Sequence, residues 1–393
     1  MKKYIYSLIT LYCIISPFYF LSSGYPQIAD FILIIAFLLF IFSYRIIVNK
    51  VTVLLIVILF LITIINLVYS IIFSSTDFFI SSIYYYFNFM LVLMVLSIYF
   101  KDGLEILKKI YKGISISLIV QVLVSLIFLN ITVSRQTLFF NNPNQLGYYA
   151  LLSFSILTLI FYLIKSNIVI YIVTSMSAVY LAVLSNSTST IIAILLLLCT
   201  QVIVMFIFVL NSKQKISLLL LFFVLFSSIV FFWDEIKSFY LIENALNRIE
   251  SKESTFNENF SYRGYDRLLQ NPTYIILGAG EGLFVERFKR GEIHSTFIAF
   301  LFNYGIITFF LLVSIFVLLI RRFKLLPIVI LILINLYGLT HNGIRQPFFW
   351  LAFIIAFIGN EKNLFDLKCI IKSKMKNKNS KHEINGDDYV NYY

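Results

Sequence analysis

The sequence predicts an all-α fold, a polytopic helical bundle embedded in a membrane with about twelve spans. Of the 393 residues, 60% are hydrophobic and only 13% are charged, and the mean hydropathy is +0.93. Apolar runs of about 17 to 25 residues recur along the chain, the length at which a helix crosses roughly 30 Å of hydrocarbon. The strand-like alternation of an outer-membrane barrel is almost absent.

Twelve apolar windows, separated by charges and turn residues, are the predicted spans. The first follows two lysines and resembles a signal peptide, but another apolar run comes directly after it, so we expect it to be retained as an anchor. The windows are 4–22, 28–44, 51–72, 78–100, 113–131, 146–164, 168–184, 189–210, 216–233, 295–320, 325–341 and 346–359.

Lysines and arginines predict the orientation, because basic residues in short loops stay on the cytoplasmic side. With the N-terminus inside, only Arg135 and Arg345 fall in short outer loops. Fourteen basic residues fall at inner positions: Lys2, Lys3, Arg45, Lys50, Lys101, Lys108, Lys109, Lys112, Lys165, Lys213, Lys215, Arg321, Arg322 and Lys324. Both termini are therefore predicted to be cytoplasmic.

This orientation divides the chain into four parts. Residues 1–233 hold spans one to nine, and residues 294–359 hold spans ten to twelve. Residues 234–293 form a long periplasmic loop with ten acidic and eight basic residues. Residues 360–393 form a basic cytoplasmic tail suited to lie near anionic lipid. A loop of such length between two spans is more often functional than merely connecting.

Composition also disfavours several function classes. The span cores lack Asp, Glu, Lys and Arg, whereas ion-coupled transporters keep such residues at mid-membrane, and Asp30 lies only at a span edge. The deep amides, such as Asn88 and Gln201, are expected to form hydrogen bonds between helices. The net charge of +12 follows from topology and indicates no nucleic-acid partner, and three isolated cysteines indicate neither a disulfide nor a metal cluster.

Four polar clusters lie at outer span ends or in the outer loop, so the predicted topology brings them to one border between membrane and water. The first is FFNNPNQLG, before the sixth span, with Asn142, Asn144 and Gln145. Because Asn before Pro starts turns and helices, a helix cap is the simpler interpretation. Binding of sugar hydroxyls by the amides is the functional one.

The second cluster, SYRGYDR, holds Tyr262, Arg263 and Arg267. On a helix the two arginines would share one face, as would two guanidinium groups that grip a diphosphate. A solvated helix with paired charges is equally well supported. The third cluster, LGAGEG, contains Glu281. This residue could act as an acid or a base, or it could be a solvated surface residue. The cluster lacks the Lys-Ser/Thr of a P-loop, and its glycines favour tight turns or close approach of the backbone to a ligand.

The fourth cluster combines His294, in GEIHSTF, with His341 and Arg345, in THNGIRQP. A single histidine at such a border is usually a polar cap. The chain has only three histidines, however, and two of them with an arginine at outer helix ends favour chemistry. Neither stretch has the spacing of a zinc site, so no metal or other cofactor is predicted.

The ordered set of motifs resembles the O-antigen polymerase and ligase superfamily over residues 135–355. The motifs are FFNNPNQLGYYALLS, LSNSTSTIIA, SYRGYDRLLQNPTYIILGAGEG, IHSTFIAFLFNYGI and LTHNGIRQPFFWL. Many members, ligases especially, carry an arginine after the Ser-rich turn, where this chain has Ser185 to Thr190 without a basic residue. A basic contact expected there is missing or comes from elsewhere.

The resemblance implies a GT-C-like glycosyltransferase of the bacterial inner membrane with a long periplasmic loop. Such enzymes join sugars carried on undecaprenyl diphosphate, without a nucleotide sugar and without a required metal. A polymerase of lipid-linked repeat units is favoured over a ligase that transfers finished polymer to lipid A core. A non-enzymatic flippase or exporter of the same saccharide is the further alternative. Whether a chain-length regulator binds the outer loop stays open.

In the predicted reaction His294 is the base, because an unperturbed pKa near 6.5 suits proton removal at neutral pH. The dipole of the tenth span would favour its neutral imidazole. The family's arginine would fall on Arg263 or Arg267, and these two, with Arg345 as a third candidate, would stabilise the departing diphosphate. Displacement in one step would invert the anomeric configuration. The predicted substrate contacts are Asn142, Asn144, Gln145, Tyr262, Glu281, His341 and Arg345.

Overall fold

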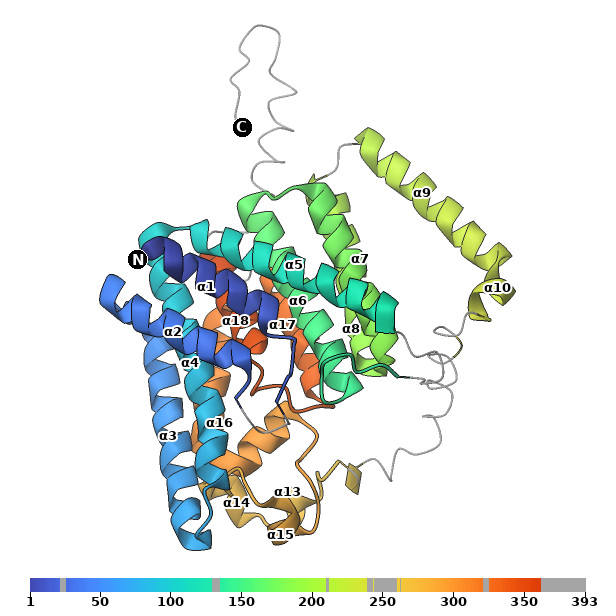
Figure 1. The fold of residues 1–393 in the computed structure, drawn as a ribbon. Helices are drawn as coiled ribbons and strands as arrows, with labels where there is room; N and C mark the ends of the chain where they lie inside the picture. Colours follow the sequence, from blue (N-terminus) through green and yellow to red (C-terminus); the bar gives the residue numbers. More distant parts are fainter. Residues whose placement is uncertain are drawn as a thin grey trace, which may run out of the picture.

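A computed structural model describes residues 1–21, 26–128, 135–209, 212–238, 243, 260–261, 263–320 and 325–361. Within these ranges the protein is helical and contains no β-strand (Figure 1). The helices are α1 (Lys2–Ile15), α2 (Ile28–Ser43), α3 (Lys50–Phe73), α4 (Asp77–Asp102), α5 (Glu105–Phe128), α6 (Pro143–Ile164), α7 (Ile168–Ser185), α8 (Thr188–Val204), η1 (Met205–Val209), α9 (Ser212–Phe231), α10 (Trp233–Lys237), α13 (Arg267–Gln270), α14 (Thr273–Leu277), α15 (Phe284–Phe288), α16 (Thr296–Ile320), α17 (Leu325–Gly338) and α18 (Pro347–Glu361).

Among the described residues, seven helices are long and apolar enough to cross a membrane: α3 to α7, α8 continued into η1, and α16. Three shorter apolar helices, α2, α17 and α18, accompany them. The prediction of a helical membrane protein is confirmed, and a helix lies in each of the twelve windows. The first window is shortened the most, since α1 ends at Ile15. Pro17 has no N–H with which to continue the helical hydrogen bonds.

Helix α6 forms the centre of the bundle and packs against α5, α7, α8, α17 and α18 (Figure 1). All its residues from Leu146 to Ile160 are buried, as expected for a helix that is apolar on every face. Gly147 allows the closest approach, because a Cβ there would lie 2.6 Å from the Ser185 hydroxyl at the end of α7. The first turn of α6 is therefore packed directly onto the Ser-rich turn between α7 and α8.

Buried amides join helices, as predicted for Gln201. The Tyr171 hydroxyl donates a 2.5 Å hydrogen bond to Gln201 Oε1, and Gln201 Nε2 donates one of 2.8 Å to Thr158 Oγ1. This network joins α6, α7 and α8. The side chain of Asn66 on α3 likewise donates to Ser82 Oγ on α4 at 2.9 Å. Neutral polar groups thus stabilise helix contacts where hydrophobic association between helices is weak.

One end of the bundle gathers basic residues that are predicted to face the cytoplasm. Lys2, at the start of α1, forms a 2.8 Å ion pair with Asp102 at the end of α4. The Tyr44 hydroxyl, after α2, donates to the same carboxylate at 2.6 Å, and the Lys101 ammonium lies 4.5 Å from the Tyr44 ring centroid. The start of α1 and the ends of α2 and α4 therefore meet, as the predicted alternation of spans requires.

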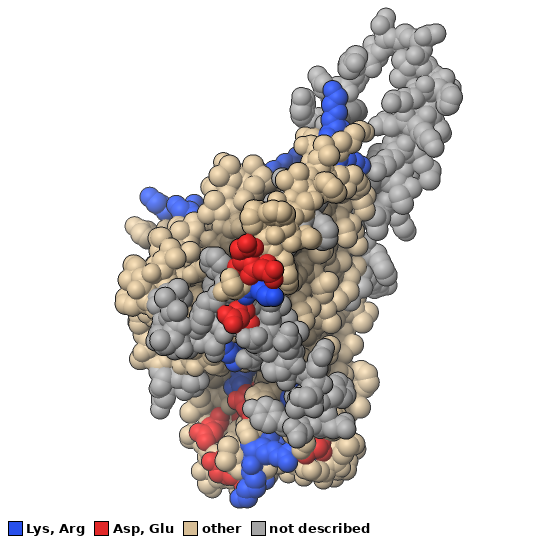
Figure 2. All heavy atoms as spheres, turned by 90° about the vertical axis from the view of Figure 1, so that its right-hand side faces the viewer, with Lys and Arg blue, Asp and Glu red and all other residues tan. Residues whose placement is uncertain are grey.

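The opposite end carries the described part of the predicted outer loop. Helices α13, α14 and α15 lie there, at the bottom of Figure 1. Figure 2 shows acidic and basic side chains gathered at this end of the molecule. Residues 263–293 thus form a small charged cap on the apolar bundle.

A break in α16 anchors this cap. Gly305 has a φ of 74° inside the helix, which interrupts the helical conformation. Next to the break, the carbonyls of Phe302 and Asn303 accept hydrogen bonds from the backbone N–H groups of Ala279 and Gly280, both at 2.9 Å. The LGAGEG backbone therefore lies directly against the backbone of α16, whereas its predicted approach to a ligand stays a prediction.

Replacing Gly305 by Ala should destabilise the protein. A left-handed φ costs a residue with a Cβ about 1–2 kcal/mol, and the added Cβ would lie 2.5 Å from the carbonyl oxygen of Ile276. We expect the melting temperature in detergent to fall by several degrees, measured by size-exclusion chromatography after heating. Gly291→Ala is the control, because nothing lies within 4 Å of a Cβ there. Equal melting temperatures of the two variants would show that the break is not needed.

Candidate functional site

A cavity of about 490 Å³ opens at the end of the bundle predicted to be outer, where α4 begins, away from Asp102. Its wall comes from the C-terminal half of α1, the starts of α2, α4 and α6, the segment before α16, and the connection from α17 to α18. These are the segments that alternation of the spans places on one side. The cavity brings together six of the predicted site residues: Asn142, Asn144, Gln145, His294, His341 and Arg345.

The FFNNPNQLG stretch is both a helix cap and a cavity wall. Asn142 Oδ1 accepts a 3.0 Å hydrogen bond from the Gln145 N–H, so Asn142 caps α6, with Pro143 in the first turn. Gln145 Oε1 accepts from the Asn141 N–H at 3.1 Å. The side-chain NH₂ groups of Asn142 and Gln145 make no hydrogen bond to any described residue. The cap therefore leaves amide donors at the cavity that can bind a ligand oxygen.

Arg135 supplies the basic contact that the Ser-rich turn lacks in its own sequence. Its Nη2 donates a 2.6 Å hydrogen bond to Asn144 Oδ1, and its Nε donates one of 3.3 Å to the Ser185 carbonyl. Arg135 thus ties the segment before α6 to the end of α7. It also holds Asn144, whose carbonyl accepts a 3.0 Å bond from the Tyr337 hydroxyl.

An aromatic stack forms the cavity wall beside Asn144. The rings of Tyr148 and Tyr337 are nearly parallel, with centroids 4.2 Å apart, and His341 stacks on the other side of Tyr337 at 4.6 Å. His341 Nδ1 lies 2.8 Å from the Thr340 hydroxyl, and its carbonyl accepts from the Thr296 hydroxyl at 3.0 Å. His341 is therefore held in place by stacking and by its neighbours rather than presented as a mobile base.

Arg345 is the cation of the cavity. Its Nη2 forms an ion pair with Glu292, and its Nε lies 3.4 Å from Glu281 Oε1. Although burial opposes the charge, the carboxylates of Glu292 and Glu281 raise the pKa of Arg345 well above its usual value, so the guanidinium stays protonated. The Nη1 group has no hydrogen-bond partner among the described residues, and 28% of the side chain is exposed. Arg345 can therefore bind an anionic group in the cavity.

Glu281 does not contact the cavity, which corrects its predicted role as a substrate ligand. Its side chain is only 1% exposed and lies beneath Arg345. The hydroxyls of Tyr85, at 3.1 Å, and Tyr304 both donate to its carboxylate, and its backbone N–H donates to Asn66 Oδ1 at 2.9 Å. Burial raises the pKa of Glu281, and the nearby Arg345 acts in the opposite direction. Glu281 therefore positions Arg345, and the alternative of a solvated surface residue is wrong.

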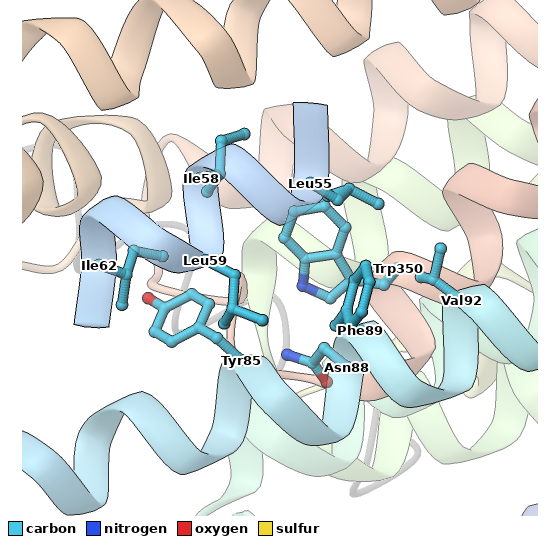
Figure 3. A pocket seen from close by; sticks show the side chains of 9 residues that line it. All are labelled: Leu55, Ile58, Leu59, Ile62, Tyr85, Asn88, Phe89, Val92 and Trp350. Atoms are coloured by element: carbon cyan, nitrogen blue, oxygen red, sulfur yellow. The ribbon is translucent and has the colours of Figure 1, made fainter. Parts of the chain in front are cut away.

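Helix α4 holds Arg345 in place through two of its side chains. Figure 3 shows Tyr85 and Asn88 projecting from α4 into the space between α4 and α3, where Trp350 of α18 closes a small apolar cavity of about 20 Å³. Asn88 Nδ2 donates a 3.2 Å hydrogen bond to the Arg345 carbonyl, while Tyr85 holds the carboxylate partner of Arg345. Both the backbone and the side chain of Arg345 are thus fixed from α4.

His294 lies two residues before α16 begins, in the cavity wall. Its backbone N–H donates to the Arg263 carbonyl at 3.1 Å, and its own carbonyl accepts from the Tyr265 hydroxyl at 3.1 Å. Partial burial lowers the pKa of His294 below 6.5; Glu292 opposes this shift, whereas the positive charges of Arg263 and Arg267 reinforce it. The imidazole is therefore predominantly neutral at pH 7, as a base requires.

The expectation that Arg263 and Arg267 share a helix face is wrong. Residues 263–266 form a turn, with Gly264 at a φ of 76°, and α13 begins only at Arg267. The Arg267 side chain is buried within the loop, where Nη2 donates to the Gly291 carbonyl at 2.5 Å. It does not line the cavity and holds the loop together instead. Tyr262 lies outside the described residues.

The sequence reasoning missed the part of the wall formed by α1, α2 and α4, which includes Tyr19, Gln27, Asp30 and Tyr84. The one signal was the position of Asp30 at the edge of a span. Nothing in the sequence shows which distant span ends meet. Within the described ranges, no three His, Cys, Asp or Glu side chains lie close enough together to hold a metal ion.

The titration of His294 can be measured directly by NMR of the protein labelled at histidine. The chain has three histidines, so variants of His341 and His382 assign the signals. We expect a midpoint below 6.5 for His294. Arg263→Gln should raise this midpoint, because it removes a positive charge that disfavours the imidazolium form.

Arg290→Gln is the control for this titration. It removes the same charge from the same loop, but Arg290 is paired with Asp266 at 2.8 Å. We expect the His294 midpoint to stay unchanged in this variant. The same midpoint in Arg263→Gln as in the unmodified protein would contradict the electrostatic explanation.

Comparison with known proteins adds no family to this geometry. No protein-family model matches the chain, and no curated protein is significantly similar to it in sequence. The function of the cavity is therefore inferred from the side chains that line it and from the order of the motifs along the chain.

Proposed function

We propose that the protein is a glycosyltransferase that polymerises undecaprenyl-diphosphate-linked oligosaccharide repeat units into O-antigen or a related surface polysaccharide. One observation carries the proposal: a base of lowered pKa, His294, and a cation, Arg345, line the same cavity at the end of the bundle predicted to be periplasmic. The resemblance of the ordered motifs to the O-antigen polymerase and ligase superfamily suggests the substrate class. A twelve-span, GT-C-like architecture in the bacterial inner membrane, with cytoplasmic termini, is part of this proposal.

The reaction needs a nucleophilic hydroxyl, a correctly presented anomeric carbon and a stabilised leaving group. His294 accepts the proton of the acceptor hydroxyl as its oxygen attacks the anomeric carbon of the donor sugar. The bond from that carbon to the diphosphate oxygen breaks, and the electron pair leaves with the lipid diphosphate. Attack from the opposite face inverts the anomeric configuration. No nucleotide is consumed, because the lipid diphosphate is itself the activating group.

Arg345 is the residue we assign to the departing diphosphate. It lines the cavity, keeps its charge and has donor capacity at Nη1, whereas Arg267 is buried away from the cavity. A guanidinium held in place by two carboxylates needs little reorganisation when negative charge develops beside it. Arg263 contributes through the pKa of His294. This changes the roles expected from sequence, in which Arg345 was the third candidate.

Two alternatives share the same substrate. A ligase would transfer the finished polymer to lipid A core, with the same base and cation. A non-enzymatic flippase or exporter would move the lipid-linked saccharide and would not need a base. Only the enzymes should depend on His294 for sugar transfer, so this residue separates the two classes.

Replacing His294 by Ala should leave the protein folded and inserted but abolish long chains. Loss of a general base typically lowers a rate by 10²- to 10⁴-fold. The measurement is extension of purified lipid-linked repeat units by protein in detergent or nanodiscs, with products separated on a gel. His382→Ala, in the predicted cytoplasmic tail, is the control and should extend chains normally. Normal extension by the His294 variant would remove this residue from the mechanism.

Deletion of the gene should distinguish the three activities in cells. Loss of a polymerase should leave lipopolysaccharide capped with a single repeat unit. Loss of a ligase should keep long chains on the lipid carrier, and loss of a flippase should accumulate lipid-linked units on the cytoplasmic side. The ladder of the deletion strain on a lipopolysaccharide gel, with lipid-linked saccharides quantified in parallel, reads out all three.

A further inference from the structure

A part of the cavity wall remains without a role in the reaction. The C-terminal half of α1, the start of α2 and the first half of α4 contribute Tyr12, Tyr19, Gln27, Asp30 and Tyr84. None of these belongs to the motifs discussed so far. They add a carboxylate and three phenol rings to a cavity whose other wall carries His294 and Arg345.

Asp30 differs from the other carboxylate of the cavity. Glu292 also lines the cavity but forms an ion pair with Arg345. Asp30 is half-buried and has no ion-pair partner among the described residues. Its Oδ2 accepts a 2.7 Å hydrogen bond from the Gln27 N–H, while its Oδ1 makes no hydrogen bond to any described residue. A partly buried carboxylate with an unused acceptor favours a hydrogen-bond donor as its ligand.

The local structure holds Asp30 in a fixed place. Its bond to Gln27 is half of the capping box that begins α2. The Gln27 side chain accepts a 3.0 Å hydrogen bond from the Leu21 N–H and donates one of 3.0 Å to the Leu21 carbonyl. This clamp joins the segment after α1 to the start of α2. The carboxylate is therefore oriented before any ligand arrives, which reduces the entropy lost on binding.

The cavity wall carries charges of both signs. Arg345 and Asp30 line the same cavity, so its wall carries both a cation and a carboxylate that has no ion-pair partner among the described residues. An anionic diphosphate is attracted to Arg345 and repelled by Asp30. Sugar hydroxyls are uncharged donors, and a carboxylate accepts hydrogen bonds from two adjacent hydroxyls at once.

We propose that Asp30 is the centre of a saccharide subsite, where its carboxylate accepts hydrogen bonds from hydroxyl or amino groups of the sugar. The lipid diphosphate occupies the Arg345 end of the cavity, and the saccharide extends toward Asp30. The assignment rests on the proposed function, since it takes a lipid-linked oligosaccharide as the ligand. It adds a selectivity: neutral or amino sugars are accepted at this position, and a sugar carboxylate is excluded by charge repulsion.

The test compares Asp30→Asn with Asp77→Asn. The amide oxygen of Asn can still accept the bond from Gln27, so the first variant keeps the cap of α2 and loses the charge. Asp77 is an exposed carboxylate in the first turn of α4, at the same end of the bundle but outside the cavity. Unchanged elution and melting temperature of both variants establish that they are folded.

The probe is the saccharide released by mild acid from lipid-linked repeat units of the deletion strain, which carries neither lipid nor diphosphate. Equilibrium dialysis of the labelled saccharide should give about tenfold weaker binding for Asp30→Asn, as expected for loss of a hydrogen bond to a charged group. Asp77→Asn should bind within about twofold of the unmodified protein. Methylation of the saccharide hydroxyls should weaken its binding to the unmodified protein by a similar factor, a result independent of any variant.

Equal saccharide affinity of Asp30→Asn and the unmodified protein would overturn the subsite, even if the unmodified protein polymerises lipid-linked units. Conversely, saccharide binding that depends on Asp30, without any chain extension by the unmodified protein, would reject the polymerase and keep the subsite. The two failures are therefore distinguishable.

Discussion

The buried carboxylate of Glu281 is the interaction on which the outer half of the structure depends. An ionisable group with 1% exposure is tolerated where hydrogen bonds and a nearby opposite charge offset its loss of hydration. Tyr85 from α4, Tyr304 from α16 and Arg345 from the connection before α18 meet that requirement. Four segments far apart in sequence are thereby held around one carboxylate. The break at Gly305 lets the LGAGEG backbone lie against α16 and deliver Glu281 to this place.

The chemistry of the cavity follows from this fixed point. Arg345 is oriented by two carboxylates and by Asn88, so in the proposed reaction a developing negative charge would meet a cation that is already in position. Burial is the main cause of the lowered pKa of His294, and the positive charges of Arg263 and Arg267 reinforce it. In the proposed reaction these two arginines would act through the base, while Arg345 would bind the anion. Asp30 adds a negatively charged group to the wall of the same cavity.

The proposed function needs a site at the border of membrane and water, and the predicted topology would place the cavity there. Its wall comes mainly from the helix ends predicted to be outer and from their connections, while the end with Asp102 lies at the far side. Apolar helix surfaces beside the cavity can accommodate polyprenyl chains, and amides, phenols and charges within it can hold saccharide and diphosphate. Charged side chains are costly inside the hydrocarbon, which explains why they are concentrated at the helix ends and are rare along the spans.

Much of this arrangement is determined locally by the sequence. Apolar runs determine the helices, and the distribution of lysine and arginine predicts which helix ends share a side of the membrane. Helix formation and orientation can be predicted because each depends only on nearby residues and the bilayer. The residues predicted in this way to lie on one side are Asn142, Asn144, Gln145, His294, His341 and Arg345. Local patterns failed where long-range contacts decide. Arg263 and Arg267 are separated by a glycine turn, Glu281 is buried by tyrosines up to 196 residues away, and Asp30 reaches the cavity because α2 packs against α1 and α4. Burial and charge pairing between distant spans leave no local periodicity, so only the tertiary structure decided which polar groups face the cavity.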